Sequence, residues 1–230
     1  MKNSIQNILR FTITALFLLF NLNIAHGQLP DGYKGLPYQD SVYRKGIQLL
    51  PGRLELAYFD LGGEGIAYHD NSSKNEGAVL NRKPGEQRPG ISSYIAFFRA
   101  NEGVDINYTK DIADFGHPNK VDPKVNQLYI SDIEPGEWTN YTIFVNHPGK
   151  YIIYTNYSSQ ENKPAELWVN NKFSCKLLFP EITGDFHLWT QSEVGQITFP
   201  ETGKFLLTLK YGGGVNFGHL DFLYNDARQK

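Results

Sequence analysis

The sequence has very little cysteine: Cys175 is the only one in 230 residues. A single cysteine excludes an internal disulfide and any cysteine-rich zinc site. We expect Cys175 itself to be a small buried apolar residue. Without a disulfide, the core must stabilise the fold, and a structural metal ion is a further candidate.

The sequence also lacks an excess of charge of either sign. Its 22 basic side chains face 24 acidic ones, so the net charge is −2 and the isoelectric point is near 6.3. A nucleic-acid-binding surface, which has to neutralise phosphates, is therefore not expected. The hydrophobic fraction of 40% is too high for a disordered chain. These values indicate a globular protein.

A hydrophobic run long enough to span a bilayer is missing. Residues 11–22 form an uncharged apolar run that follows Lys2 and Arg10 and precedes small residues ending at Gly27. The order basic, apolar, small is typical of a secretory signal, and about a dozen apolar residues fall short of the roughly 20 that a membrane helix needs. We predict a signal peptide at 1–27 and a secreted mature chain, periplasmic or extracellular, without a membrane span.

Helical periodicity is hard to find, whereas short runs rich in Val, Ile, Thr, Phe and Tyr recur between turn residues. These runs predict strands over 53–58, 104–108, 127–131, 138–145, 151–157, 166–169, 173–179, 194–199, 204–211 and 220–224. Turns at 146–150 and 200–203 predict two hairpins. About ten short strands predict one all-β domain, a two-sheet sandwich or jelly roll, over 53–230. Residues 28–52 are expected to form an extended arm on it, and 70–92 a long polar loop, either functional or disordered.

Motifs of hydrolytic or nucleotide-dependent enzymes are absent. The chain has no Gly-x-Ser-x-Gly, no His-Glu-x-x-His and no glycine-rich phosphate loop. A carboxylate pair for glycoside cleavage cannot be recognised from spacing, because the fold brings such a pair together. An enzyme that uses His69, Asp70 or Glu102 therefore stays open as an alternative.

Aromatic residues are abundant, and aromatic rings can stack on the C–H faces of sugars. Most of those in strand-like runs are expected to be core: Trp138, Tyr141, Trp168 and Trp189. Aromatic residues in loops are better candidates for ligand contact: Tyr68, Phe115, Phe186 and Phe217. The glycine-rich run 211–219 predicts a flexible loop or a plain wide turn.

Five segments in order resemble family 6 carbohydrate-binding modules. They are Leu54-Glu55 to Asp60 with Gly62-Gly63-Glu64-Gly65-Ile66-Ala67-Tyr68-His69-Asp70; Arg99 with Glu102-Gly103-Val104-Asp105-Ile106; Pro135-Gly136-Glu137-Trp138-Thr139-Asn140-Tyr141-Thr142; Thr183-Gly184 with Trp189; and Leu220-Asp221-Phe222. The resemblance covers about residues 53–226. It implies a β-jelly-roll, sugar binding, no catalysis by the module and a structural calcium ion.

Carried over residue by residue, the resemblance implies two calcium ligands, Glu55 and Asp221, with Ala57 where the family has a second glutamate. It implies a loop-end sugar site at Asp132, Phe186, and Asn216 or His219. One aromatic of the family's site is replaced by Asp132, so either the ligand sits differently, the concave sheet face serves instead, or sugar binding is lost.

We therefore expect a secreted, non-catalytic module that binds a polysaccharide or glycan and acts alongside secreted glycoside hydrolases. The alternatives are a hydrolase or lyase on the same fold, and a structural or adhesion module that no longer binds sugar.

Overall fold

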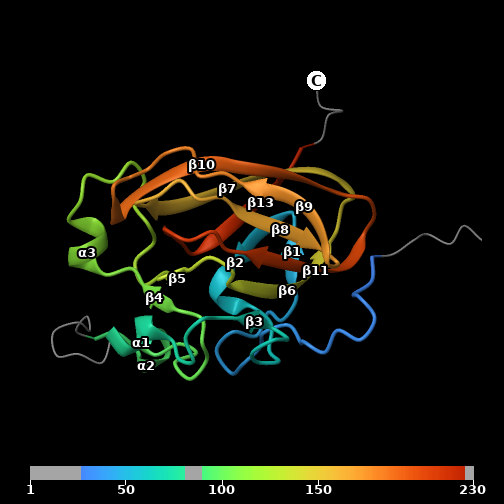
Figure 1. Cartoon of the computed structure of the whole chain (residues 1–230), viewed down its shortest axis with the longest axis horizontal. Coiled ribbons are helices and arrows are strands. Elements are labelled where there is room, and N and C mark those ends of the chain that lie inside the picture. The colour runs from blue at the N-terminus through green and yellow to red at the C-terminus, as the bar shows by residue number, and fades with distance from the viewer. Residues whose placement is uncertain (1–26, 81–89, 226–230) are drawn as a thin grey trace, which may run out of the picture.

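The structure is a computed structural model that describes residues 27–80 and 90–225. Two β-sheets pack face to face, which confirms the predicted all-β sandwich (Figure 1). The predicted signal peptide lies outside the described residues except for Gly27, whose N–H and C=O bond to the backbone of Thr202 and Lys204. In the described parts of the chain, no helix has the length and apolar character needed to cross a membrane.

The first sheet, called the β6 sheet, has the strand order β1-β6-β11-β8-β9, and β3 pairs with β6. Its strands are β1 (Gln48–Leu50), β3 (Tyr68–His69), β6 (Trp138–Val145), β8 (Ala165–Val169), β9 (Lys172–Leu177) and β11 (Gly203–Lys210).

The second sheet, called the β7 sheet, has the order β2-β13-β7-β12-β5-β4, and β10 pairs with β7. Its strands are β2 (Gly52–Glu55), β4 (Ile106–Tyr108), β5 (Leu128–Ile130), β7 (Gly149–Ser159), β10 (Asp185–Phe199), β12 (Val215–Phe217) and β13 (His219–Tyr224).

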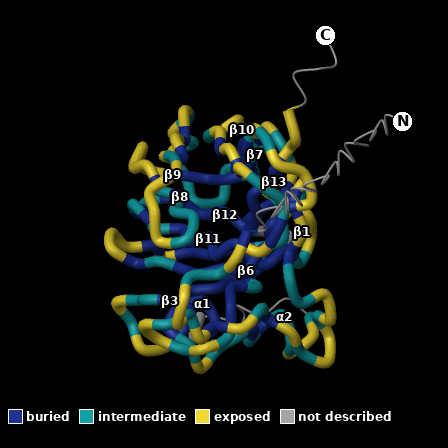
Figure 2. The backbone as a smooth tube through the Cα atoms, turned by 90° about the vertical axis from the view of Figure 1, so that its right-hand side faces the viewer, coloured by how far each residue is buried: buried dark blue, intermediate teal, exposed yellow. Residues whose placement is uncertain are grey.

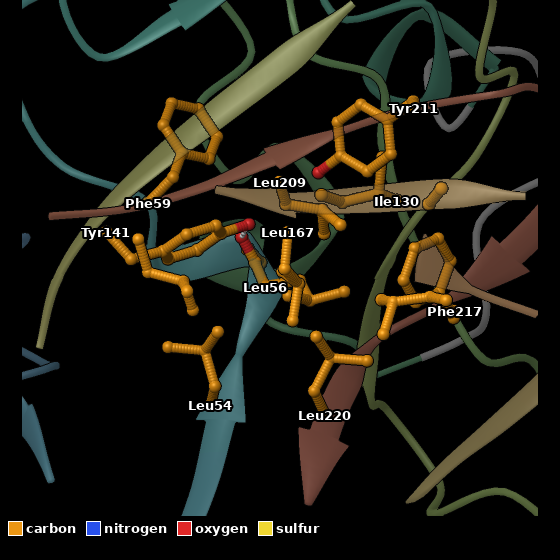
Figure 3. Packing of buried hydrophobic residues seen from close by; sticks show 14 of the residues in the cluster. Leu54, Leu56, Phe59, Ile130, Tyr141, Leu167, Leu209, Tyr211, Phe217 and Leu220 are labelled. Carbon is orange, nitrogen blue, oxygen red and sulfur yellow. Dashed lines mark hydrogen bonds between the residues drawn. The ribbon is translucent and has the colours of Figure 1, made fainter. Parts of the chain in front are cut away.

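The core lies between the sheets because alternate residues of each strand point inward. On β7, Tyr151, Ile153, Thr155 and Tyr157 are buried, and the residues between them are partly exposed. Figure 3 shows inward-facing residues of both sheets in contact, and Figure 2 shows that the buried backbone follows the strands. The residues labelled there include Tyr141, Leu167 and Leu209 of the β6 sheet and Leu54, Ile130, Phe217 and Leu220 of the β7 sheet.

Both predicted hairpins are wrong. The turn at 146–150 joins β6 to β7, and the turn at 200–203 joins β10 to β11, so each turn leads from one sheet into the other. The two strands at each turn lie in different sheets and are not hydrogen-bonded neighbours. A turn sequence shows that the chain reverses, but not which backbone edges meet afterwards.

The hairpin that does form between neighbouring strands joins β8 to β9. Asn170 and Asn171 make its turn, with φ angles of 48° and 63°. Asparagine tolerates this left-handed conformation, and two successive residues with positive φ match the right-handed twist of the strands. The Asn170 side chain also accepts a hydrogen bond from the Leu206 backbone N–H at 2.9 Å, which ties the hairpin to β11.

The arm at 28–52 packs on the sandwich through tyrosines and ends in a strand. The Tyr33 hydroxyl donates to Asp60 at 2.7 Å, and the Tyr43 ring stacks on Tyr58 with 3.8 Å between centroids. Tyr38 is buried in the core cluster. The last residues of the arm form β1, which pairs in parallel with β6.

Short helices occur where no regular structure was predicted, and a 3-10 turn occupies the end of the run predicted as a strand over 53–58. Helix α1 (Glu76–Leu80) lies inside the predicted polar loop, whose residues 81–89 fall outside the described chain. Helices α2 (Ser93–Ala96) and α3 (Asp111–Phe115) and the 3-10 turn η1 (Leu56–Tyr58) are each only about one turn long. Such short pieces carry no detectable hydrophobic period.

The glycine-rich run 211–219 is not a free loop. Its residues 215–217 form β12, and Phe217 is fully buried. Tyr68 is also buried, so two of the four aromatics expected in loops belong to the core. Cys175 is partly buried against the core, and burial raises the pKa of its thiol to about 11.

Candidate functional site

The outer face of the β6 sheet carries a pocket of about 220 Å³. Strand pairing places its residues in rows: Lys210 lies between Trp138 and Glu166, and Thr208 lies between Asn140 and Trp168. Directly opposed residues on neighbouring strands point to the same face, so these side chains lie together. We call this the tryptophan pocket, lined by Trp138, Asn140, Trp168, Asn171, Thr208 and Lys210.

The Trp168 ring is held in place from three directions. Its Nε1–H donates to Glu166 Oε2 at 2.9 Å, and the Lys210 ammonium lies 3.8 Å from the ring centroid. The Phe173 ring meets it edge-on at 5.9 Å between centroids. The indole is half-buried, so part of its surface stays open to a ligand. A ring fixed in this way loses little conformational entropy on binding.

The Trp138 ring forms the other side of the tryptophan pocket. It is half-buried, and His69 on β3 lies directly opposite it, with 6.4 Å between ring centroids. His69 is fixed in turn by Glu64, whose Oε1 lies 2.5 Å from Nδ1. A histidine and a glutamate thus stand beside this tryptophan as hydrogen-bonding groups.

The polar side chains at the floor of the tryptophan pocket already form hydrogen bonds within the protein. Asn140 donates through Nδ2 to the Ile66 carbonyl at 2.8 Å and accepts from the Thr208 hydroxyl at 2.5 Å. The Asn171 side chain is exposed and lines the pocket. Asn171 and Lys210 therefore offer the pocket's hydrogen-bonding groups to a ligand, with Glu166 beside them.

A second pocket, of about 170 Å³, lies at the ends of β5, β10 and β12 and brings together three of the four residues predicted for sugar binding. Asp132, Phe186 and Asn216 all line it. We call it the loop pocket. Its other lining residues are Asn107, Tyr129, Ser131, Ile133, His187, Gly214 and Val215.

The predicted residues that line the loop pocket differ in exposure and in the hydrogen-bonding groups that they leave available. Asp132 is exposed, and Phe186 is half-buried. Asn216 is buried, and its Nδ2 donates to the Phe186 carbonyl at 3.0 Å, which leaves its side-chain oxygen as the available group. The Ser131 hydroxyl, also buried, has no partner in the described chain.

One lining residue of the loop pocket, His187, is paired with the carboxylate of Asp114. His187 Nδ1 lies 2.9 Å from Asp114 Oδ1, and the same carboxylate oxygen accepts from Trp189 Nε1 at 2.9 Å. Asp114 is fully buried, and its hydrogen bond to His187 raises the pKa of that imidazole. The loop pocket therefore has a histidine that protonates more readily than usual.

His219, the fourth residue predicted to contact sugar, does not join the other three in the loop pocket. Its side chain is 1% exposed, and its Nδ1 accepts from the Gln127 side chain at 3.1 Å. Residue 219 lies on β13, opposite Glu55 of β2, and does not line the loop pocket. The position follows Gly218, where an added Cβ would lie 2.5 Å from the Leu128 carbonyl oxygen, so this segment packs closely against β5.

The two predicted calcium ligands lie on neighbouring strands, but their surroundings do not fit the ion. Both oxygens of Asp221 accept hydrogen bonds from Arg53, from Nε at 2.7 Å and from Nη2 at 2.8 Å. Calcium needs six to eight oxygen ligands. In the described part of the chain, no three His, Cys, Asp or Glu side chains are grouped so that they could hold a metal.

The residues considered for catalysis are engaged in different ways. Glu102 binds Arg99 through both oxygens, at 2.9 and 2.7 Å, and Asp70 accepts from the backbone and hydroxyl of Ser72. His69 stands at the edge of the tryptophan pocket, paired with Glu64. Glu102 and Asp70 are thus engaged in local structure, whereas His69 lies beside a pocket.

Sequence reasoning missed Trp138 and Trp168 as candidates for ligand contact, because both lie inside strands. A signal was present in the alternation of residues. On β8, Ala165 and Leu167 are the inward apolar positions, so Trp168 shares the outer face with Glu166. On β6, Trp138 likewise shares its face with Asn140, whereas Tyr141 faces the core, as predicted.

Neither a protein-family model nor a curated protein sequence matches the chain. Several solved structures are similar to it. A family 6 carbohydrate-binding module from Clostridium stercorarium, solved with cellobiose, has a TM-score of 0.47 and 11% identity over 79% of this chain and 99% of that one. A β-1,3-glucan-binding family 6 module from Bacillus halodurans has a TM-score of 0.45 and 12% identity over 77% and 98%. A family 35 module from Clostridium thermocellum has a TM-score of 0.38 and 17% identity over 47% and 85%. Two of these three structures are from the family that the sequence motifs resemble.

Proposed function

We propose that this protein binds a polysaccharide or glycan in the tryptophan pocket and does not cleave it. The observation that carries the proposal is the pair of half-buried indoles, Trp138 and Trp168, on one outer sheet face. An outward-facing tryptophan costs solubility, and two of them beside exposed hydrogen-bonding side chains match the flat faces and hydroxyl edges of a sugar.

The tryptophan pocket is preferred over the loop pocket because it offers more aromatic surface. The loop pocket has one partly exposed ring, Phe186, since Tyr129 beneath it is only 1% exposed. Its unpartnered Ser131 hydroxyl and exposed Asp132 still give it hydrogen-bonding capacity. The loop pocket is therefore the second candidate for the same function.

The proposal is tested by isothermal titration calorimetry with soluble polysaccharides and their oligosaccharides. Cellobiose and β-1,3-glucan are the first ligands to try, since the two family 6 modules named above bind them. Trp138→Ala should abolish binding or weaken it strongly, and Phe186→Ala should leave it unchanged. Tyr224→Ala is the matched control, because Tyr224 is an exposed aromatic of the β7 sheet outside both pockets.

The possible results distinguish the two pockets, the adhesion alternative and the enzyme alternative. Loss of binding only in Phe186→Ala would move the site to the loop pocket. Equal saccharide binding by all variants would contradict both pockets as the site. No binding to any saccharide would contradict sugar recognition itself and favour the adhesion alternative. New reducing ends or unsaturated products that vanish in His69→Ala would establish an enzyme instead.

Export of the mature chain belongs to the same proposal. A secreted binder without a catalytic function of its own would hold substrate near secreted glycoside hydrolases. Cell fractionation with detection of the mature N-terminus near residue 28 tests this part.

A further inference from the structure

Arg53 and Asp221 form a two-point ion pair between strands β2 and β13. The two residues are directly opposite each other in the antiparallel pairing. Arg53 Nε lies 2.7 Å from Oδ1 and Nη2 lies 2.8 Å from Oδ2, so both carboxylate oxygens are occupied. The planar guanidinium matches a carboxylate in this geometry, whereas a lysine ammonium would act only as a point charge.

The environment of Glu55, the other predicted ligand, is also rich in positive charge. Arg53, Lys124 and Lys45 all act electrostatically on its carboxylate. Ala57, two residues further along, contributes no oxygen from its side chain and is buried. A divalent cation beside Glu55 and Asp221 would face the Arg53 guanidinium, and in the described chain no third acidic side chain joins this pair to hold it.

We infer that the Arg53 guanidinium is the built-in cation of this strand pair and that the fold is stable without calcium. Arg53 neutralises Asp221 and bridges the edge strand β2 to β13, which a shared metal ion would otherwise do. Because the cation is covalently attached, the link does not depend on the metal concentration outside the cell. This inference is independent of whether the protein binds a saccharide.

The first test compares thermal unfolding in EGTA with unfolding in calcium at about 10 mM, well above the 0.1–1 mM dissociation constants of extracellular calcium modules. A ligand that binds only the folded state must raise the melting temperature. We expect the two wild-type melting curves to coincide. A lower melting temperature in EGTA would overturn the inference.

The second test removes the guanidinium. Arg53→Gln should lower the melting temperature, because the partly buried Asp221 carboxylate loses its partner. Arg44→Gln is the matched control, since Arg44 is exposed and makes no ion pair in the described chain. An Arg53→Gln protein that melts like the wild type would show that the guanidinium does not fill this role.

The third test converts the position of Arg53 into part of a metal site. Arg53→Glu places a third carboxylate beside Glu55 and Asp221, so this variant should be destabilised in EGTA and stabilised by added calcium. Arg44→Glu should show no calcium effect. Absence of calcium stabilisation in a folded Arg53→Glu protein would contradict the idea that the guanidinium occupies a cation position. If that variant does not fold in either condition, the melting temperature of Arg53→Gln decides.

Discussion

Asp105 is a buried carboxyl group whose titration should make the protein less stable as the pH rises. Its side chain is 6% exposed, and burial raises its pKa to about 8, with further contributions from Asp70, Asp132 and Glu137. Its carboxyl oxygen accepts the Glu76 backbone N–H, which opposes the shift without cancelling it. The folded protein therefore keeps a proton that the unfolded chain, with a pKa near 4, has lost.

The sign and size of the effect follow from proton linkage. Between the two pKa values the folded state binds one more proton, so the free energy of unfolding falls by up to about 1.4 kcal/mol for each pH unit. Asp105→Asn removes this term and keeps the acceptor for Glu76. From about pH 5 to pH 7 the variant should gain roughly 2–3 kcal/mol relative to the wild type.

Urea unfolding at several pH values, followed by tryptophan fluorescence, measures the difference. Asp122→Asn, at an exposed carboxylate, controls for the removal of one negative charge. The wild-type and Asp105→Asn stabilities should diverge steadily as the pH rises. Parallel curves would mean that Asp105 is already ionised in the folded protein near pH 5, and the reasoning from burial would fail.

Two further predictions concern the pocket and the core. Trp168→Ala should weaken saccharide binding by about 1–3 kcal/mol, or about 5- to 150-fold in Kd by calorimetry. Leu167, the residue before it, faces the core, so Leu167→Ala should cost about 2–5 kcal/mol of stability in urea and leave the affinity of the folded protein unchanged. The reverse pattern would contradict the assigned faces of β8. Gly212→Ala should unfold at a lower urea concentration, because the added Cβ would lie 2.1 Å from the Pro164 carbonyl oxygen; a variant as stable as the wild type would show that this backbone contact is looser than described.

The strands could be predicted because each one is a short β-branched or aromatic run between turn residues. The run 138–145 coincides with β6, and 204–211 differs from β11 by one residue at each end. Strand β1, with three residues, and β3, with two, are too short to show an alternation, and their pairing with β6 is decided by tertiary contacts. Local sequence carries no information about such contacts.

Sheet membership could not be predicted from the turns. The Pro148-Gly149 turn resembles a hairpin turn, yet Gly149 begins a strand of the opposite sheet. The Asn170-Asn171 pair, which does close a hairpin, was the better signal, because two successive residues that tolerate positive φ favour a tight two-residue turn.

The site was predicted in part. The resemblance brought Asp132, Phe186 and Asn216 together correctly in one pocket, because aligned motifs preserve loop positions. It also named His219, which the structure buries on β13 opposite Glu55 and outside this pocket. The tryptophan pocket was missed because a strand tryptophan is most often core, and only the alternation with Glu166 on β8 shows that Trp168 faces outward.

The central claim is that a saccharide binds on the face that carries Trp138 and Trp168, and the three indole N–H groups of the chain test it directly. In a ¹⁵N–¹H NMR titration with a bound saccharide, the Trp138 and Trp168 indole signals should shift. The Trp189 signal should stay in place, since this ring is fully buried, donates to Asp114 and packs edge-on against Tyr129 beneath the loop pocket. A shift of Trp189 alone, or of none of the three signals under saturating ligand, would contradict the account.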